Sequence, residues 1–117
     1  MTKVLVVDDD SSMRFLFKMI FESAGFEVIE AQHGADALAR LKDFRPHLVV
    51  TDLMMPVMDG HHLIAALRSD PSTALIPVLA TTAQINNASS GADAVLTKPF
   101  DPDELLRTAR TLTGVGG

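Results

Sequence analysis

Polar residues that could do chemistry follow four short apolar runs in this sequence. They are, in chain order, the pair Asp8 and Asp9 after residues 4–7, Asp52 after 48–50, Thr82 (or Thr81) after 77–80, and Lys98 after 94–96. Continuous apolar runs of this length are typical of strands buried on both faces of a parallel sheet. Ligands bind at the carboxyl ends of such strands, so acids placed there are poorly suited to structure and well suited to chemistry.

The types of these residues indicate phosphoryl chemistry with a metal ion. Three carboxylates at one edge repel one another strongly, so keeping them ionised needs a cation, and Mg2+ prefers oxygen ligands. Lys98 adds a fixed positive charge, and a threonine hydroxyl adds a hydrogen-bond donor. Such a set suits a carboxylate nucleophile that attacks phosphorus and is left as an acyl phosphate. For Asp10 we keep the plainer interpretation of a helix cap or loop acid.

The elements that must position these groups alternate along the chain. Apolar patterns and turn residues predict strands at 4–7, 26–31, 48–50, 77–80 and 94–96, and helices from Ser11 or Ser12 to about 24, from 34 to about 42, from Asp59 to about 70, and from Asp101 or Asp103 through 109. This alternation predicts an α/β fold with a doubly wound, five-stranded parallel sheet. In the flavodoxin-like order 2-1-3-4-5, the four polar strand ends are neighbours.

Composition sets further limits. The chain has 117 residues, 47% of them hydrophobic, so we expect one domain over residues 1–117 with a buried core. A net charge of -5 argues against nucleic-acid binding, and the absence of cysteine excludes disulfides and thiolate metal sites. The first residues lack a signal-peptide pattern, and no apolar segment is long enough to span a bilayer. We expect a cytoplasmic domain without membrane contact.

Four fragments of the sequence occur in an order that points to one family. They are VLVVDDDSSMR, LVVTDLMMPVMDG, PVLATTA and VLTKPF. Each fragment is weak alone, but all four in this order, over nearly the full length, are highly specific. The chain resembles a response-regulator receiver domain of the chemotaxis-regulator type, the phosphoacceptor of bacterial two-component signalling.

The resemblance assigns roles to the site residues. It implies that Asp52 is phosphorylated, that Mg2+ is held by Asp8, Asp9, Asp52 and the backbone carbonyl of Met54, that the Thr82 hydroxyl moves towards the phosphoryl group, that Lys98 bonds to it, and that the Lys98–Pro99 peptide is cis. A histidine kinase or histidine phosphotransfer protein would supply the phosphoryl group. The domain would be a switch that acts on a downstream protein rather than an enzyme, and it would not contact nucleic acid directly.

The first predicted helix also indicates a docking surface. Its core stripe has helical spacing and comprises Met13, Leu16, Phe17, Ile20 and Ala24. Phe15 and Met19 lie on the opposite side, beside Arg14, and large apolar groups that face water indicate an interaction surface. By resemblance, the phosphodonor docks here, near Pro99. Ordinary scattered surface hydrophobicity is the alternative.

Two features depart from the family pattern. Only eight residues, 83–90, separate Thr82 from Gly91, so we expect the fourth helix to be short, missing or disordered. Val95 stands three residues before Lys98, where the family commonly has Tyr or Phe. These departures favour an alternative, a degenerate receiver that acts as a constitutive interaction module without phosphorylation. A phosphotransferase or phosphatase acting on outside substrates is a further alternative, opposed by the lack of a cap or substrate domain.

Overall fold

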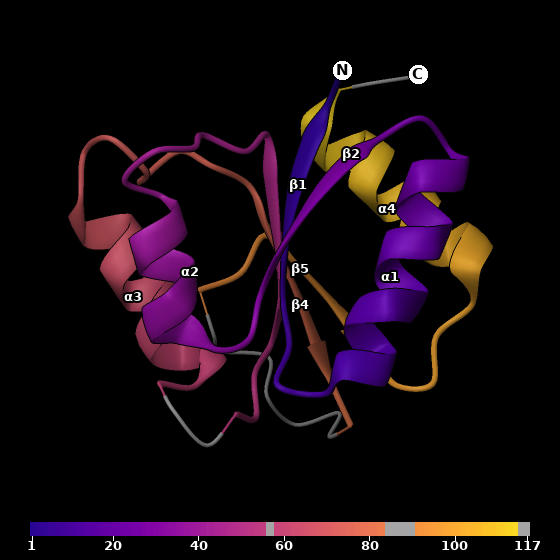
Figure 1. The fold of residues 1–117 in the computed structure, drawn as a ribbon, viewed down its shortest axis with the longest axis horizontal. Helices are drawn as coiled ribbons and strands as arrows, with labels where there is room; N and C mark the ends of the chain where they lie inside the picture. The colour runs from indigo at the N-terminus through magenta and orange to yellow at the C-terminus, as the bar shows by residue number, and fades with distance from the viewer. Residues whose placement is uncertain (56–57, 84–90, 115–117) are drawn as a thin grey trace.

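The computed structural model describes residues 1–55, 58–83 and 91–114. In this part of the chain the elements are, in order, β1 (Lys3–Val7), α1 (Ser11–Ser23), β2 (Glu27–Ala31), α2 (Gly34–Arg40), β3 (Leu48–Asp52), α3 (Gly60–Ser69), β4 (Val78–Thr82), β5 (Ala94–Thr97) and α4 (Pro102–Thr113). All strand pairs are parallel, in the order β2-β1-β3-β4-β5. The sheet lies between α1 and α4 on one face and α2 and α3 on the other (Figure 1). The predicted flavodoxin-like fold is confirmed.

Apolar side chains of the central strands fill the layers on both faces of the sheet. Alternate residues of a strand point to opposite faces. Leu5 and Val49 therefore pack in the core beside α2 and α3, whereas Val4 and Val50 pack in the core beside α1 and α4. All four side chains are fully buried. A slip of one residue would exchange the two faces, so this burial fixes the strand register and with it the positions of the strand ends.

The buried stripe of α1 differs from the predicted one at two positions. Phe21, which the prediction omits, is fully buried and packs edge-on against Phe26, with ring centroids 5.3 Å apart. Leu16, which was predicted to face the core, is 37% exposed. The stripe runs through Met13, Phe17 and Phe21 because this rotation of the helix buries two large aromatic rings against the sheet.

Aspartates supply three of the helix N-caps. Asp10 caps α1, since it has an extended backbone and its carboxylate accepts the N–H of Ser12 at 2.9 Å. The predicted cap at Ser11 or Ser12 is therefore wrong, while the interpretation of Asp10 as a cap is confirmed. Asp59 caps α3 and Asp101 caps α4, both as predicted. A carboxylate at this position bonds an unpaired backbone N–H and interacts favourably with the helix dipole.

One predicted feature falls outside the described residues. The expectation of a short, missing or disordered fourth helix concerns residues 83–90, and the structure describes only Ala83 of these. The helix labelled α4 is the later one, which follows β5 and starts at the predicted cap. Within the described ranges, no helix is both long enough and apolar enough to cross a membrane.

Candidate functional site

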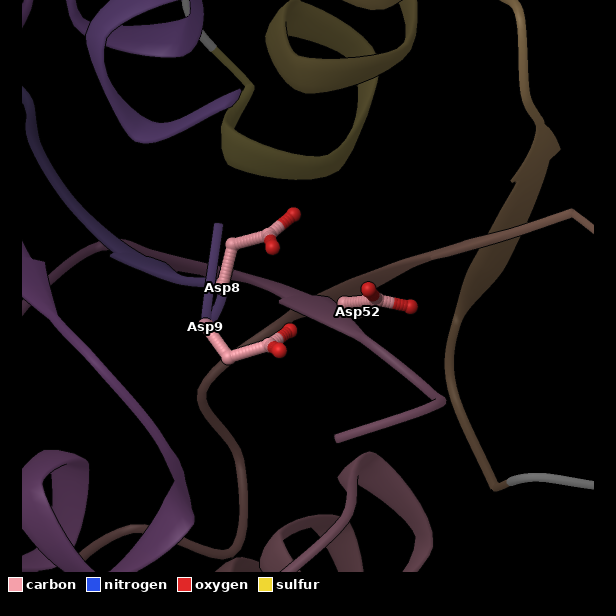
Figure 2. Close-up of side chains that lie close together, drawn as sticks. All are labelled: Asp8, Asp9 and Asp52. Atoms are coloured by element: carbon pink, nitrogen blue, oxygen red, sulfur yellow. The ribbon is translucent and has the colours of Figure 1, made fainter. Parts of the chain in front are cut away.

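The carboxyl ends of β1 and β3 bring three carboxylates together. Asp8 and Asp9 directly follow β1, and Asp52 is the last residue of β3. One oxygen atom of each residue lies within 4.8 Å of the corresponding atoms of the other two. Figure 2 shows the three side chains side by side. Asp8 and Asp52 are buried, whereas Asp9 is exposed. Two separate segments of the chain thus form the acidic group that the sequence predicts.

Lys98 places a positive charge against this acidic group. Its backbone N–H donates to the Thr82 carbonyl at 2.7 Å, which ties the end of β5 to the end of β4. Its Nζ atom lies 3.1 Å from Asp52 Oδ2 and 3.3 Å from Asp8 Oδ2. The ammonium group therefore bridges the two buried carboxylates. The Lys98–Pro99 peptide is cis, as the family resemblance implies.

Burial and neighbouring charges shift two pKa values in the site. Desolvation raises the pKa of the Asp8 carboxyl, and the backbone N–H of Asp10 and the charge of Lys98 only partly oppose this effect. For Lys98, burial alone would lower the pKa, but the charges of Asp8 and Asp52 outweigh it and raise the pKa. Lys98 is therefore a permanent cation at neutral pH. A further cation beside Asp8 would favour its ionised form.

A tight loop fixes Asp52 and the residues after it. The N–H of Met54 donates to Asp52 Oδ1 at 3.0 Å, and the N–H of Gly60 donates to the Leu53 carbonyl at 3.2 Å. A Cβ atom at Gly60 would lie 2.5 Å from the Asp52 carbonyl oxygen, so the loop can close this tightly only on a glycine. Met54, whose carbonyl is the fourth predicted metal ligand, is held beside the acidic group with its side chain exposed.

Two buried threonines end β4 next to the site. The strand register pairs Thr81 with Asp52, and Thr82 with Thr97 one residue further along. Thr82, the predicted hydroxyl residue, thus lies at the strand end that also holds the backbone of Lys98. The Oγ1 atom of Thr81 is buried and has no hydrogen-bond partner among the described residues. That unpaired hydroxyl was not predicted, because the sequence does not show which hydroxyls find a hydrogen-bond partner in the folded chain.

The acidic group fits a hard divalent cation. Its three members offer carboxylate oxygens, and no imidazole or thiolate belongs to the cluster found in the described ranges. Mg2+ takes oxygen ligands and keeps several waters, so a few carboxylates on one side suffice to bind it. Softer metals prefer sulfur or imidazole. The residues present therefore suit Mg2+.

The predicted docking surface on α1 is exposed at two of its three positions. Phe15 is 61% exposed and Met19 is 49% exposed. An apolar cleft of about 310 Å³ lies beside this helix and is lined by Met13, Leu16, Lys98, Pro99 and Phe100. The Arg14 side chain, by contrast, is only 15% exposed, and it bonds to the Asp8 carbonyl and to Glu30. The prediction that Arg14 lies on the open surface is therefore wrong.

Comparison with known proteins identifies relatives of one kind. The family model described as response regulator receiver domain matches residues 4–110. The DNA-binding dual master transcriptional regulator RpaA of Synechocystis is 40% identical over 118 aligned residues, which cover 96% of this chain and 49% of that protein. The DNA-binding response regulator MtrA of Mycobacterium tuberculosis is 34% identical over 111 residues, which cover 92% and 49%.

The chain spans about half the length of the curated relatives it matches. DNA binding is a property of those longer relatives. The prediction that the chain makes no direct contact with nucleic acid stays a prediction.

Solved structures give the same result. The chemotaxis protein CheY4 of Vibrio cholerae superimposes with a TM-score of 0.90 at 34% identity, covering 96% of this chain and 98% of that one. The response regulator TrrA of Thermotoga maritima, solved in complex with Mg2+ and BeF, gives a TM-score of 0.87 at 28% identity, covering 96% and 99%. Receiver domains are signalling switches of two-component systems. With a family match over most of its length, the chain belongs to the response regulator receiver domain family.

Proposed function

We propose that this receiver accepts a phosphoryl group on Asp52 from a phosphohistidine donor and changes conformation as its output. The surroundings of Asp52 support this proposal most strongly. Two acidic neighbours lie within 4.8 Å and an ammonium group lies at 3.1 Å. A purely structural carboxylate at a strand end has no need of two further acids beside it, because each added charge raises the cost of folding.

The transfer step needs a fixed nucleophile. A carboxylate oxygen of Asp52 attacks phosphorus, the bond from phosphorus to the donor imidazole breaks, and the imidazole nitrogen leaves with a proton from solvent. The N–H of Met54 holds one Asp52 oxygen and Lys98 holds the other, so the carboxylate is oriented before the donor arrives. The Lys98 ammonium stabilises the charge of the transferred group. The Thr82 hydroxyl, at the neighbouring strand end, would bond the phosphoryl group after transfer.

Mg2+ would be held by the carboxylates of Asp8, Asp9 and Asp52 and by the Met54 carbonyl. When bound, the ion neutralises the acidic group and the phosphoryl oxygens, which allows an anionic nucleophile to meet an anionic donor. The TrrA structure contains Mg2+ and BeF and provides the relevant comparison within the family. Lys98 is shared between Asp8 and Asp52 here, and it would turn to the phosphoryl group once the carboxylates have another cation.

Incubation with a small phosphodonor such as acetyl phosphate tests the proposal. In the presence of Mg2+, intact-mass measurement should show one added phosphoryl group on the wild type and none on Asp52→Asn. Removing Mg2+ with EDTA should stop the reaction. Phosphorylation of the Asp52→Asn variant at the wild-type rate would show that the acceptor is elsewhere.

The same experiment separates the proposal from the constitutive interaction module. Val95 is the observation that favours the module, because a valine cannot provide the aromatic side chain commonly found at this position of the family. A wild-type protein that neither binds Mg2+ nor gains mass would support the module. Continuous release of inorganic phosphate from an added phosphate ester would instead support an enzyme acting on outside substrates.

The phosphodonor protein would dock on α1 over Phe15, Met19 and the adjacent cleft beside Lys98. The double change Phe15→Ala with Met19→Ala should slow phosphotransfer from the cognate kinase or phosphotransfer protein, because it removes exposed apolar contact area. Phosphorylation by acetyl phosphate should not change. Leu75→Ala is the matched control, since Leu75 is 93% exposed and follows α3 at the opposite end of the sheet. Equal transfer to the double variant and the wild type would contradict docking on α1.

A further inference from the structure

The side chain of Arg14 makes two contacts that have no part in the proposed docking or phosphoryl transfer. It lies in the first turns of α1, where its backbone N–H bonds to the Asp10 carbonyl. Its side chain turns back along the helix towards the site. One guanidinium nitrogen, Nη1, donates to the carbonyl oxygen of Asp8 at 2.7 Å. A second nitrogen, Nε, lies 3.3 Å from Glu30 Oε1 on β2.

The carbonyl that Arg14 binds belongs to the peptide group joining Asp8 to Asp9. The remaining polar groups of Asp8 are also held: its N–H donates to the Ala31 carbonyl at 3.2 Å, and its Oδ1 accepts the N–H of Asp10 at 2.9 Å. The Asp8 carbonyl, in turn, accepts its bond from the half-buried side chain of Arg14. Rotation of this peptide would move the Asp9 carboxylate relative to that of Asp8.

Arg14 acts on the site through geometry rather than as an extra cation. Its charge is directed to Glu30, which also lies 3.9 Å from the ammonium of Lys18. The cation in contact with the metal-binding carboxylates is Lys98. A guanidinium suits the linking role because its donors form a planar fork that can bond two acceptors at once.

We propose that Arg14 is a positioning residue that sets the spacing of Asp8 and Asp9 for Mg2+ by holding the peptide between them. The proposal rests on the proposed function, in which these two acids bind the ion. Residues that orient metal ligands typically change metal affinity by about 10- to 100-fold when they are replaced. Arg14 therefore controls the Mg2+ affinity of the receiver and, at limiting Mg2+, its rate of phosphorylation.

The test compares Arg14→Met, Arg14→Lys and Glu30→Gln. Mg2+ dissociation constants are measured by isothermal titration calorimetry, and acetyl phosphate reaction rates by intact mass across a range of Mg2+ concentrations. Arg14→Met should bind Mg2+ about tenfold more weakly. Its phosphorylation rate should fall at low Mg2+ and recover at saturating Mg2+. Arg14→Lys keeps one donor for the Asp8 carbonyl and should give an intermediate affinity. Glu30→Gln leaves the carbonyl contact in place and should stay close to wild type.

Three results would overturn the proposal. Tighter Mg2+ binding by Arg14→Met would mean that the arginine acts only as a competing charge. Unchanged Mg2+ binding combined with slower transfer from the cognate kinase alone would return Arg14 to a docking role. Weaker binding by Glu30→Gln equal to that of Arg14→Met would assign the effect to the ion pair. Failure of the wild type itself to bind Mg2+ would refute the proposed function instead. Circular dichroism identifies variants that do not fold. Arg14→Lys is the mildest of the changes, because lysine keeps the positive charge and one hydrogen-bond donor.

Discussion

The metal-free protein should become more stable when Asp9 is changed to asparagine. Asp9 is the exposed member of the acidic group, and its carboxylate lies within 4.8 Å of those of Asp8 and Asp52. No ion pair that the structure gives for the described ranges involves Asp9, so the change removes two repulsions and breaks no ion pair. The longer-range attraction to Lys98, which bridges Asp8 and Asp52, is the smaller opposing effect. Asparagine has nearly the same size and shape, so packing stays as it is.

The size of the effect follows from the distance. Two unit charges 4.8 Å apart repel by about 0.9 kcal/mol in a dielectric of about 80, which suits an exposed side chain. Physiological salt, with a Debye length of about 8 Å, roughly halves this energy. Two such pairs give about 1 kcal/mol in all at physiological salt and about 2 kcal/mol at low salt. For a domain of this length, 1 kcal/mol raises Tm by about 4 °C.

Urea unfolding followed by far-UV circular dichroism provides the measurement, because the chain has no Trp or Tyr to serve as a fluorescence probe. In EDTA, Asp9→Asn should unfold at higher urea than the wild type, and the difference should shrink as salt is added. In excess Mg2+ the order should reverse, since only the wild type gains stability from tight binding of the ion. Asp43→Asn, an exposed acid between α2 and β3 at the other end of the sheet, controls for net charge. A less stable Asp9→Asn in EDTA would refute the reasoning.

Two further predictions concern buried and capping groups. Thr81→Val should stabilise the protein by about 1 kcal/mol in urea unfolding, because it removes a buried hydroxyl without a partner. Thr51→Val should instead destabilise it by about 1 kcal/mol, since that hydroxyl donates to the Asp52 carbonyl at 3.0 Å, and equal effects of the two changes would contradict this account. Asp59→Ala should cost about 1 kcal/mol by removing the α3 cap, whereas Asp59→Asn should keep most of it. The backbone N–H of His62 bonds to the Asp59 carboxylate and holds its pKa below the usual 3.8. The ionised carboxylate therefore stabilises the folded state fully above pH 3.8, and this stabilisation is lost as the pH falls through the lowered pKa of the folded state. Thermal melts should therefore show the difference between wild type and Asp59→Asn vanishing in acid.

The strand ends could be predicted from the sequence because the central strands are covered on both faces. A strand buried on both faces is a continuous apolar run, and such a run ends visibly where a charge begins, as at Asp8. The parallel order then requires that these ends meet at one edge of the sheet. Residue type and spacing alone therefore locate the three acids and Lys98. The metal-ligand and phosphoacceptor roles came from the family resemblance.

The rotation of α1 could not be predicted, because apolar residues occupy more than one face of this helix. Residues 13, 15–17 and 19–21 are all apolar, so several stripes fit the helical period equally well. The choice is made by the sheet, which accommodates Phe17 and Phe21 and leaves Leu16 at the cleft. Arg14 was misplaced for the same reason, since the rotation that buries Phe21 also turns Arg14 towards the site.

The crowding of acids and the ability to bind Mg2+ have a common physical cause. Charges held at fixed positions by buried strands cannot separate to relieve their repulsion, so the folded state carries that repulsion until a cation arrives. The bound cation supplies the attraction that offsets this repulsion. Because it binds the folded state and not the unfolded one, it raises stability by mass action. Asp9→Asn is the most direct test of this link, because it should raise the stability of the metal-free protein and lower the affinity for Mg2+ together. Asp9→Asn, which should be more stable than the wild type without Mg2+, should gain less stability from the ion. Arg14→Met keeps all three carboxylate charges but loses the bond that sets their spacing, so it should lose Mg2+ affinity without the gain in stability.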